Sequence, residues 1–220
     1  MRLRFLILLL IACAFAFPAM AQDDPMSEYS ATEKAGFAFY NIIRQPPPFT
    51  RWVEIRPDYI TSKPKVRLAM MDAERDRLKR GFATYIPDRD LITIRTRVHV
   101  QRKAVEPGAA RTAISLSFPD SDDILYFPFQ LGDVWIALTP SGLDAQSDYA
   151  LTPAENESLP KSGDMTAELT LTPVRVDERE PIIIGGTPLW LMLTNVRQLS
   201  LLDNENQPVW TASQFPERGQ

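Results

Sequence analysis

The stretch from Pro181 to Thr211 constrains the fold of this chain more than any other. At its centre, five consecutive apolar residues, Leu189 to Leu193, lie between Pro188 and Asn195. A membrane-spanning helix needs about 20 apolar residues, whereas a run of this length is typical of a strand covered on both faces. We therefore expect this run to form the centre of a β-sheet core.

Further strands are indicated by apolar residues that recur at every second position. Such alternation is typical of strands with one buried face. It occurs at Ile92, Ile94, Val98 and Val100, at Ile114, Leu116 and Phe118, and at Ala167, Leu169 and Leu171. Turns are expected at 106–108, 119–123 and 204–208. Because the strands follow one another without intervening helices, the sheet is expected to be antiparallel.

Two hairpins can be placed from their turn residues. Gly132-Asp133 is a favoured two-residue loop, and Gly185-Gly186 is a similar signal before the central strand. The register set by the first loop makes every facing pair apolar: Leu131 with Val134, Phe129 with Ile136, and Phe127 with Leu138. Pro128 cannot donate a ladder hydrogen bond, which predicts an edge strand or a bulge there.

Two helices are expected before these strands, at about 31–44 and 64–80. Ser30 and Glu33 have the form of a capping box, while Pro64 suits the start of the second helix and Gly81 its end. The prolines at 46–48 are interpreted as a rigid elbow, in preference to a ligand for a polyproline-binding domain. Residues 52–55 suggest a short edge strand.

The elements together predict an α+β fold dominated by β-structure: an antiparallel β-sheet or β-sandwich preceded by two N-terminal helices. Residues 30–212 are expected to form one β-rich domain, with strands over about 84–212. Flexible segments are predicted at 22–29 and 213–220. Residues 141–164 are rich in Ser, Pro, Asp and Glu, and are interpreted as a long polar loop.

The first 21 residues have the form of a secretory signal peptide. Two arginines precede an apolar run of about 13 residues, and Ala19-Met20-Ala21 gives a cleavage site after Ala21. A competing interpretation takes Leu10 to Cys13 as a lipobox, with a lipoprotein anchored at Cys13. We prefer cleavage at Ala21 because the polar QDDP sequence follows it directly. The chain is therefore expected to be periplasmic or secreted, with no transmembrane segment after cleavage.

Charge and cysteine content exclude several classes of function. Removing residues 1–21 leaves 22 basic against 28 acidic residues, a net charge of −6, so we expect no nucleic-acid partner. The single cysteine, Cys13, leaves with the signal, so the mature chain would have no disulfide, thiol nucleophile or thiolate ligand. We predict no cofactor.

Catalytic signals are weak. His99 is the only histidine, it lies among arginines, and no GxSxG motif accompanies it. A zinc site would need oxygen for its remaining ligands. Carboxylates in the 120–123 and 203–205 turns could hold calcium, but turns favour these residues anyway. We therefore assign no catalytic and no metal residues. A glycosidase needs only two carboxyl groups, so a secreted carboxylate-dependent hydrolase of carbohydrate stays open as the alternative function.

A basic stripe, Arg95, Arg97 and His99, is the candidate site for an anion or a partner. Because the neighbouring apolar residues face the core, the period of two places these three side chains on the opposite face of one strand. Cross-strand pairing with a residue such as Glu168 is the simpler explanation of the stripe. The sequence thus predicts an exported envelope protein that is not an enzyme and binds or scaffolds a protein or another envelope component.

Overall fold

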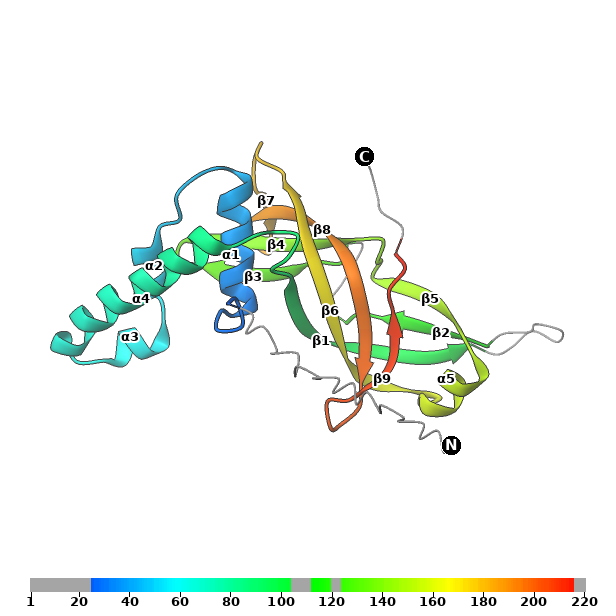
Figure 1. The fold of residues 1–220 in the computed structure, drawn as a ribbon. Coiled ribbons are helices and arrows are strands. Elements are labelled where there is room, and N and C mark those ends of the chain that lie inside the picture. Colours follow the sequence, from blue (N-terminus) through cyan, green and yellow to red (C-terminus); the bar gives the residue numbers. More distant parts are fainter. Residues whose placement is uncertain (1–24, 104–111, 120–123, 216–220) are drawn as a thin grey trace, which may run out of the picture.

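The computed structural model describes residues 25–103, 112–119 and 124–215, which form a curled β-sheet with helices at one end (Figure 1). Strands account for 42% of these residues and helices for 28%, so the predicted α+β fold with dominant β-structure is confirmed. The sheet curls into a half-barrel, and the predicted alternative of a sandwich is wrong. The signal peptide, its cleavage site at Ala21 and Cys13 lie outside the described residues.

Within the described residues, four helices, rather than two, precede the sheet. They are α1 (Ala31–Ile42), α2 (Phe49–Glu54), α3 (Pro57–Thr61) and α4 (Pro64–Thr84), and a fifth, α5 (Pro153–Ser158), lies between strands. The edge strand predicted at 52–55 is wrong because this segment belongs to α2. Its buried residues, Phe49, Trp52 and Val53, are spaced at i, i+3 and i+4, which is a helical and not a strand period.

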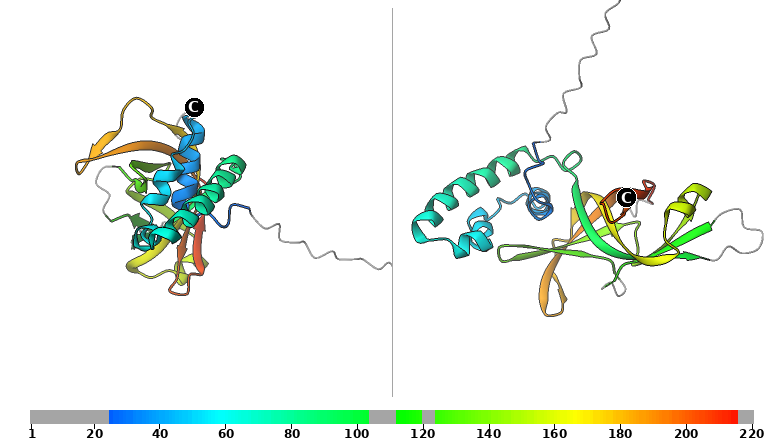
Figure 2. Two further views of the ribbon diagram at one scale, coloured as in Figure 1. Left: turned by 90° about the vertical axis from the view of Figure 1, so that its left-hand side faces the viewer. Right: turned by 90° about the horizontal axis from the view of Figure 1, so that it is seen from below.

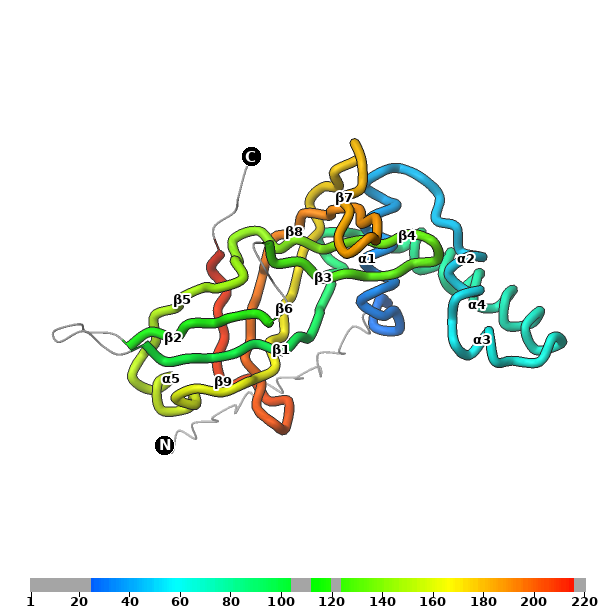
Figure 3. Tube along the Cα trace, turned by 180° about the vertical axis from the view of Figure 1, so that it is seen from behind, coloured from blue at the N-terminus to red at the C-terminus, as the bar shows by residue number. Residues whose placement is uncertain are grey.

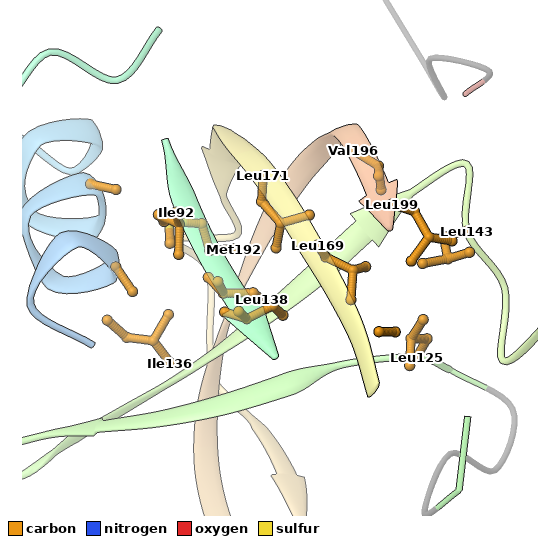
Figure 4. Packing of buried hydrophobic residues seen from close by; sticks show 14 of the residues in the cluster. Ile92, Leu125, Ile136, Leu138, Leu143, Leu169, Leu171, Met192, Val196 and Leu199 are labelled. Carbon is orange, nitrogen blue, oxygen red and sulfur yellow. The ribbon is translucent and has the colours of Figure 1, made fainter. Parts of the chain in front are cut away.

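Helix α1 begins as predicted. The Ser30 hydroxyl accepts the backbone N–H of Glu33, and the Glu33 carboxylate accepts the backbone N–H of Ser30. The helix buries residues 35–40 against the end of the sheet, beside Ile92 and Ile136 (Figure 4). Of the segment 22–29, which the sequence predicted to be flexible, residues 22–24 lie outside the described residues, and Met26 and Tyr29 are buried.

Helix α4 runs past its predicted end. Gly81 lies inside the helix, which ends at Thr84, and it is buried. A side chain at this position would collide with the rings of Tyr29 and Phe37, because a Cβ there would lie 2.5 Å from two carbons of Tyr29. Gly81 therefore allows these rings to pack closely against the helix, and the prediction that it ends the helix is wrong.

In the part of the chain that the structure describes, the sheet has nine strands in the order β3-β4-β8-β6-β1-β2-β5, with β7 and β9 also paired to β8. The strands are β1 (Ile92–Lys103), β2 (Thr112–Ser117), β3 (Phe127–Leu131), β4 (Val134–Ser141), β5 (Gln146–Leu151), β6 (Ser162–Val176), β7 (Ile182–Ile184), β8 (Thr187–Leu202) and β9 (Pro208–Ala212). The first strand thus begins at Ile92, later than the predicted 84.

Strand β8 is the centre of the sheet, as predicted. One of its edges pairs with β6 and β7, and the other pairs with β4 and β9. The expectation that the 189–193 run is covered on both faces holds only in part: Leu189 and Met192, which lie on opposite faces, are buried, whereas Leu191 and Leu193 are half-buried.

One pair departs from the predicted antiparallel sheet, since β4 and β8 run parallel. These strands are separated in the chain by β5, α5, β6 and β7. A parallel pair requires a long crossover, and here that crossover itself contains strands. The pairings predicted from turn residues, which join strands adjacent in the chain, are confirmed. The β3–β4 hairpin has the predicted register, and the β7–β8 hairpin turns at Gly185-Gly186.

The polar loop predicted at 141–164 is also wrong, because β5, α5 and the start of β6 occupy it. Helix α5 has its own capping box, formed by Thr152 and Glu155. Strand β5 is polar on one side, and its Tyr149 ring lies 5.2 Å from that of Trp210 on β9. Because β5 and β9 are far apart in the strand order, this contact requires the sheet to curl until the two strands meet (Figures 2 and 3).

Phe215 also packs against Tyr149, with the two ring centroids 6.3 Å apart. The segment 213–215, predicted to belong to a flexible tail, is thus partly held against β5. The interior of the curl is filled by aliphatic side chains of the central strands, among them Leu138, Leu169, Leu171, Met192 and Leu199 (Figure 4).

Candidate functional site

The basic stripe lies on the outer face of β1. Arg95, Arg97 and His99 are exposed, while Ile94, Val98 and Val100 on the same strand are buried. The predicted alternation of this strand is therefore confirmed, and the three candidate residues do share one face. Their assignment to a binding site stays a prediction.

Two of the three residues have acidic partners on β6. Arg95 lies opposite Glu168, and its Nε donates to Glu168 Oε2 at 2.7 Å. His99 lies opposite Asp164, with Nδ1 2.8 Å from Asp164 Oδ1. Directly opposed unlike charges stabilise an antiparallel pair. The cross-strand pairing of Arg95 with Glu168, which the sequence suggested as the simpler explanation, is confirmed.

Arg97 differs from its neighbours. It lies opposite Thr166, which offers no charge, and the structure gives Arg97 no ion pair within the described part of the chain. Arg97 borders a polar groove of about 580 Å³ between β6 and the turn that joins β8 to β9. Asp164, Asp203 and Asn206 also line this groove.

The other cations of β1 are engaged within the protein. Lys103 forms an ion pair with Asp148 on β5, and the Arg102 guanidinium donates to the Leu159 carbonyl. Arg97 is therefore the stripe residue whose charge the described fold does not use.

A second hollow lies where the helices meet the sheet. It has a volume of about 540 Å³ and is bordered by Trp52 and Leu131 and by a charged cluster. In that cluster Arg77 donates to both Glu33 and Glu74, and Arg56 also pairs with Glu74. Sequence reasoning missed the cluster because its members come from α1, α4 and the α2–α3 connection. The only signal in the sequence was the run of charged residues at 72–80, in the second predicted helix.

Glu74 in this cluster is poorly suited to acid catalysis. The hydrogen bond from Arg77 holds the pKa of Glu74 below its ordinary value, and this effect exceeds the opposing effect of burial. A glycosidase acid requires the reverse, a raised pKa. Every described carboxyl with a resolved shift has a lowered pKa, and these are Asp58, Glu74, Asp90, Asp148, Glu155 and Asp177.

Of the two turns whose carboxylates could hold calcium, the structure describes only the one at 203–205. Residues 120–123 lie outside the described residues. In the other turn, the Asp203 carboxylate accepts the backbone N–H groups of Glu205 and Gln207, each at 2.8 Å, which is an ordinary turn role. Among the residues that the structure describes, no group of three or more His, Cys, Asp or Glu side chains could hold a metal ion.

Comparison of the chain with protein-family models, with curated proteins and with solved structures found no match. Within the described ranges, none of the helices combines the length and the apolar character needed to span a bilayer.

Proposed function

We propose that this protein is exported, acts outside the cytoplasm without catalysis, and binds another macromolecule of the cell envelope through the outer face of β1 and β6. Support for export comes from the signal-like sequence of residues 1–21. Support for binding comes from the basic stripe, and in particular from Arg97.

The decisive observation is the difference between Arg97 and its two neighbours. Arg95 and His99 each pair with an acidic residue at the facing position of β6, but Arg97 faces a threonine. A guanidinium presents several donors in a rigid fork that suits a carboxylate or a phosphate. Arg97 would therefore bind an anionic group of the partner, and the polar groove beside it would accommodate neighbouring atoms.

The alternative, a carboxylate-dependent hydrolase of carbohydrate, receives less support. Glu33 and Glu74 border the hollow at the helix–sheet junction, but both are bound to Arg77. The hydrogen bond from Arg77 stabilises the ionised form of Glu74, so this carboxyl is not poised to donate a proton to a leaving group.

The test compares two charge reversals on the same strand. Cells expressing the tagged protein are crosslinked, and captured molecules are identified by mass spectrometry for the native chain, Arg97→Glu, Arg95→Glu and the distant control Arg179→Glu. Arg97→Glu is expected to abolish capture without changing the melting temperature. Arg95→Glu places two carboxylates at facing positions and is expected to lower the melting temperature.

Undiminished capture by Arg97→Glu would contradict the proposed binding face. A loss of capture that only follows a loss of stability, in both stripe variants, would assign the stripe a structural role. Hydrolysis of a polysaccharide panel that disappears in Glu74→Gln would favour the alternative function.

A further inference from the structure

The helices α2 to α4 form an arm that projects from the end of the sheet (Figures 1 and 2). None of its residues from 54 to 77 is buried. Helix α3 buries no side chain, and α4 buries only Leu78 and Gly81, close to the sheet. The far part of the arm therefore has no fully buried side chain, although Tyr59 and Met71 are half-buried against the hydrophobic core.

The arm tip, defined as residues 59–71, exposes large apolar side chains. Ile60 is 54% exposed, Val66 49% and Leu68 71%. Single exposed apolar residues are common, but several in one short projecting segment indicate a contact surface. Val66 and Leu68 are two positions apart in α4, so they project about 200° apart around the helix axis. The exposed apolar residues thus surround the tip and do not form one face.

The arm tip is also basic. Lys63, Lys65 and Arg67 are its only charged residues, which gives this segment a charge of +3 in a chain whose net charge is −4. Arg67 is occupied within the tip, where it donates to the carbonyls of Ser62 and Ile60. Lys63 and Lys65 are exposed, and the structure gives neither an ion pair with any described residue.

We propose that the arm tip inserts into the surface of a lipid bilayer that contains anionic lipids. Ile60, Val66 and Leu68 would enter the boundary between head groups and acyl chains, and the two lysines would lie against lipid phosphates. A bilayer is preferred to a protein partner because a fluid apolar phase can surround a tip, whereas one rigid surface would cover only one side of it. This contact is separate from the face around Arg97, so either proposal can fail without the other.

Vesicle flotation of the chain from Gln22 onward, which retains every described residue, provides the first test. Binding is expected with vesicles of phosphatidylcholine and phosphatidylglycerol, and it should weaken with added salt and be much weaker with phosphatidylcholine alone. Lys63→Gln with Lys65→Gln should weaken binding about five-fold per lysine. Val66→Ser with Leu68→Ser should abolish it.

A matched control makes the same kinds of change away from the arm. Ile183 on β7 is 66% exposed, and Lys161 is an exposed lysine, so Ile183→Ser with Lys161→Gln removes comparable groups. This variant should bind vesicles like the native chain. All variants should keep the native melting temperature, because the changed side chains are exposed.

Insertion can be measured directly, because the chain from Gln22 onward lacks Cys13, the only cysteine of the sequence, so that an introduced cysteine can be labelled alone. An environment-sensitive fluorophore attached to Leu68→Cys should shift to the blue with anionic vesicles, and one attached to Ile183→Cys should not. Equal binding by native and arm-tip variants, or no shift at Leu68→Cys, overturns the proposal. Self-association that only the arm-tip variants lose, without vesicle binding, would overturn it in favour of a contact between copies of the chain.

Discussion

The substitution Gly81→Ala tests how tightly α4, the last helix of the arm, packs against Tyr29 and Phe37. Gly81 lies in the last turn of α4, where the sequence predicted a helix end and the structure has a tight contact. Alanine is the better helix former, by about 1 kcal/mol in a helix interior. Helix propensity alone therefore predicts that this substitution stabilises the protein.

The surrounding geometry predicts the opposite. An added Cβ would lie 2.5 Å from Cε1 and Cζ of Tyr29 and 2.9 Å from Cε2 of Phe37, whereas carbon atoms in favourable contact are about 3.5 to 4.0 Å apart. Tyr29 cannot easily withdraw, because its hydroxyl donates to the Arg77 carbonyl at 2.8 Å and the Arg77 guanidinium lies over its ring. Overpacking costs about 1 to 3 kcal/mol, and the upper part of that range applies here.

We therefore expect Gly81→Ala to lower the free energy of unfolding by about 2 kcal/mol after the gain in helix propensity, and the melting temperature by about 4 to 8 °C. Urea unfolding followed by circular dichroism measures this change. In a Tyr29→Ala background the same substitution should cost much less, since one of the two rings is gone. A stabilised Gly81→Ala protein, or an equal loss in both backgrounds, would refute the packing explanation.

Three further predictions concern single polar groups. Ser30→Ala should lower the free energy of unfolding by about 1 kcal/mol because it removes the cap of α1, and Ser30→Asn should restore most of it, both measured by urea unfolding. Asp90→Asn should cost about 1 to 3 kcal/mol in the same assay, because the buried carboxylate accepts the Ile86 N–H at 2.6 Å. Arg77 lowers the pKa of Glu74, so the stability that Glu74 contributes is present above about pH 4.3 and is lost as the pH falls through its folded pKa. Unfolding measured over a pH series should show a smaller acid loss for Glu74→Gln, and an unchanged acid loss would contradict this pairing.

Several features of the fold could be predicted because they depend on residues close in the chain. The capping box at Ser30, the hairpin at Gly132-Asp133 and the alternation of β1 each follow from local hydrogen bonding or from the period of a strand. The same local rule placed Arg95, Arg97 and His99 on one face. Position along a strand determines which side a residue faces, whatever the rest of the sheet does.

Other features were decided by contacts between distant segments. The parallel pairing of β4 with β8 depends on the path of the whole intervening chain, and β5 is a strand because β2 and Trp210 lie beside it, although its sequence is polar. Gly81 could signal a helix end or a close approach, and only the position of Tyr29 distinguishes the two.

The candidate sites divide in the same way. The sequence by itself determined that three basic side chains share a face and that a segment with a charge of +3 interrupts an acidic chain. Only the tertiary structure decided that Arg97 faces a threonine while its neighbours face carboxylates, and that no side chain of the arm tip is fully buried. The physical reason is that charge compensation and burial depend on which residues the fold brings opposite one another, and strand register and helix docking set this across long stretches of chain.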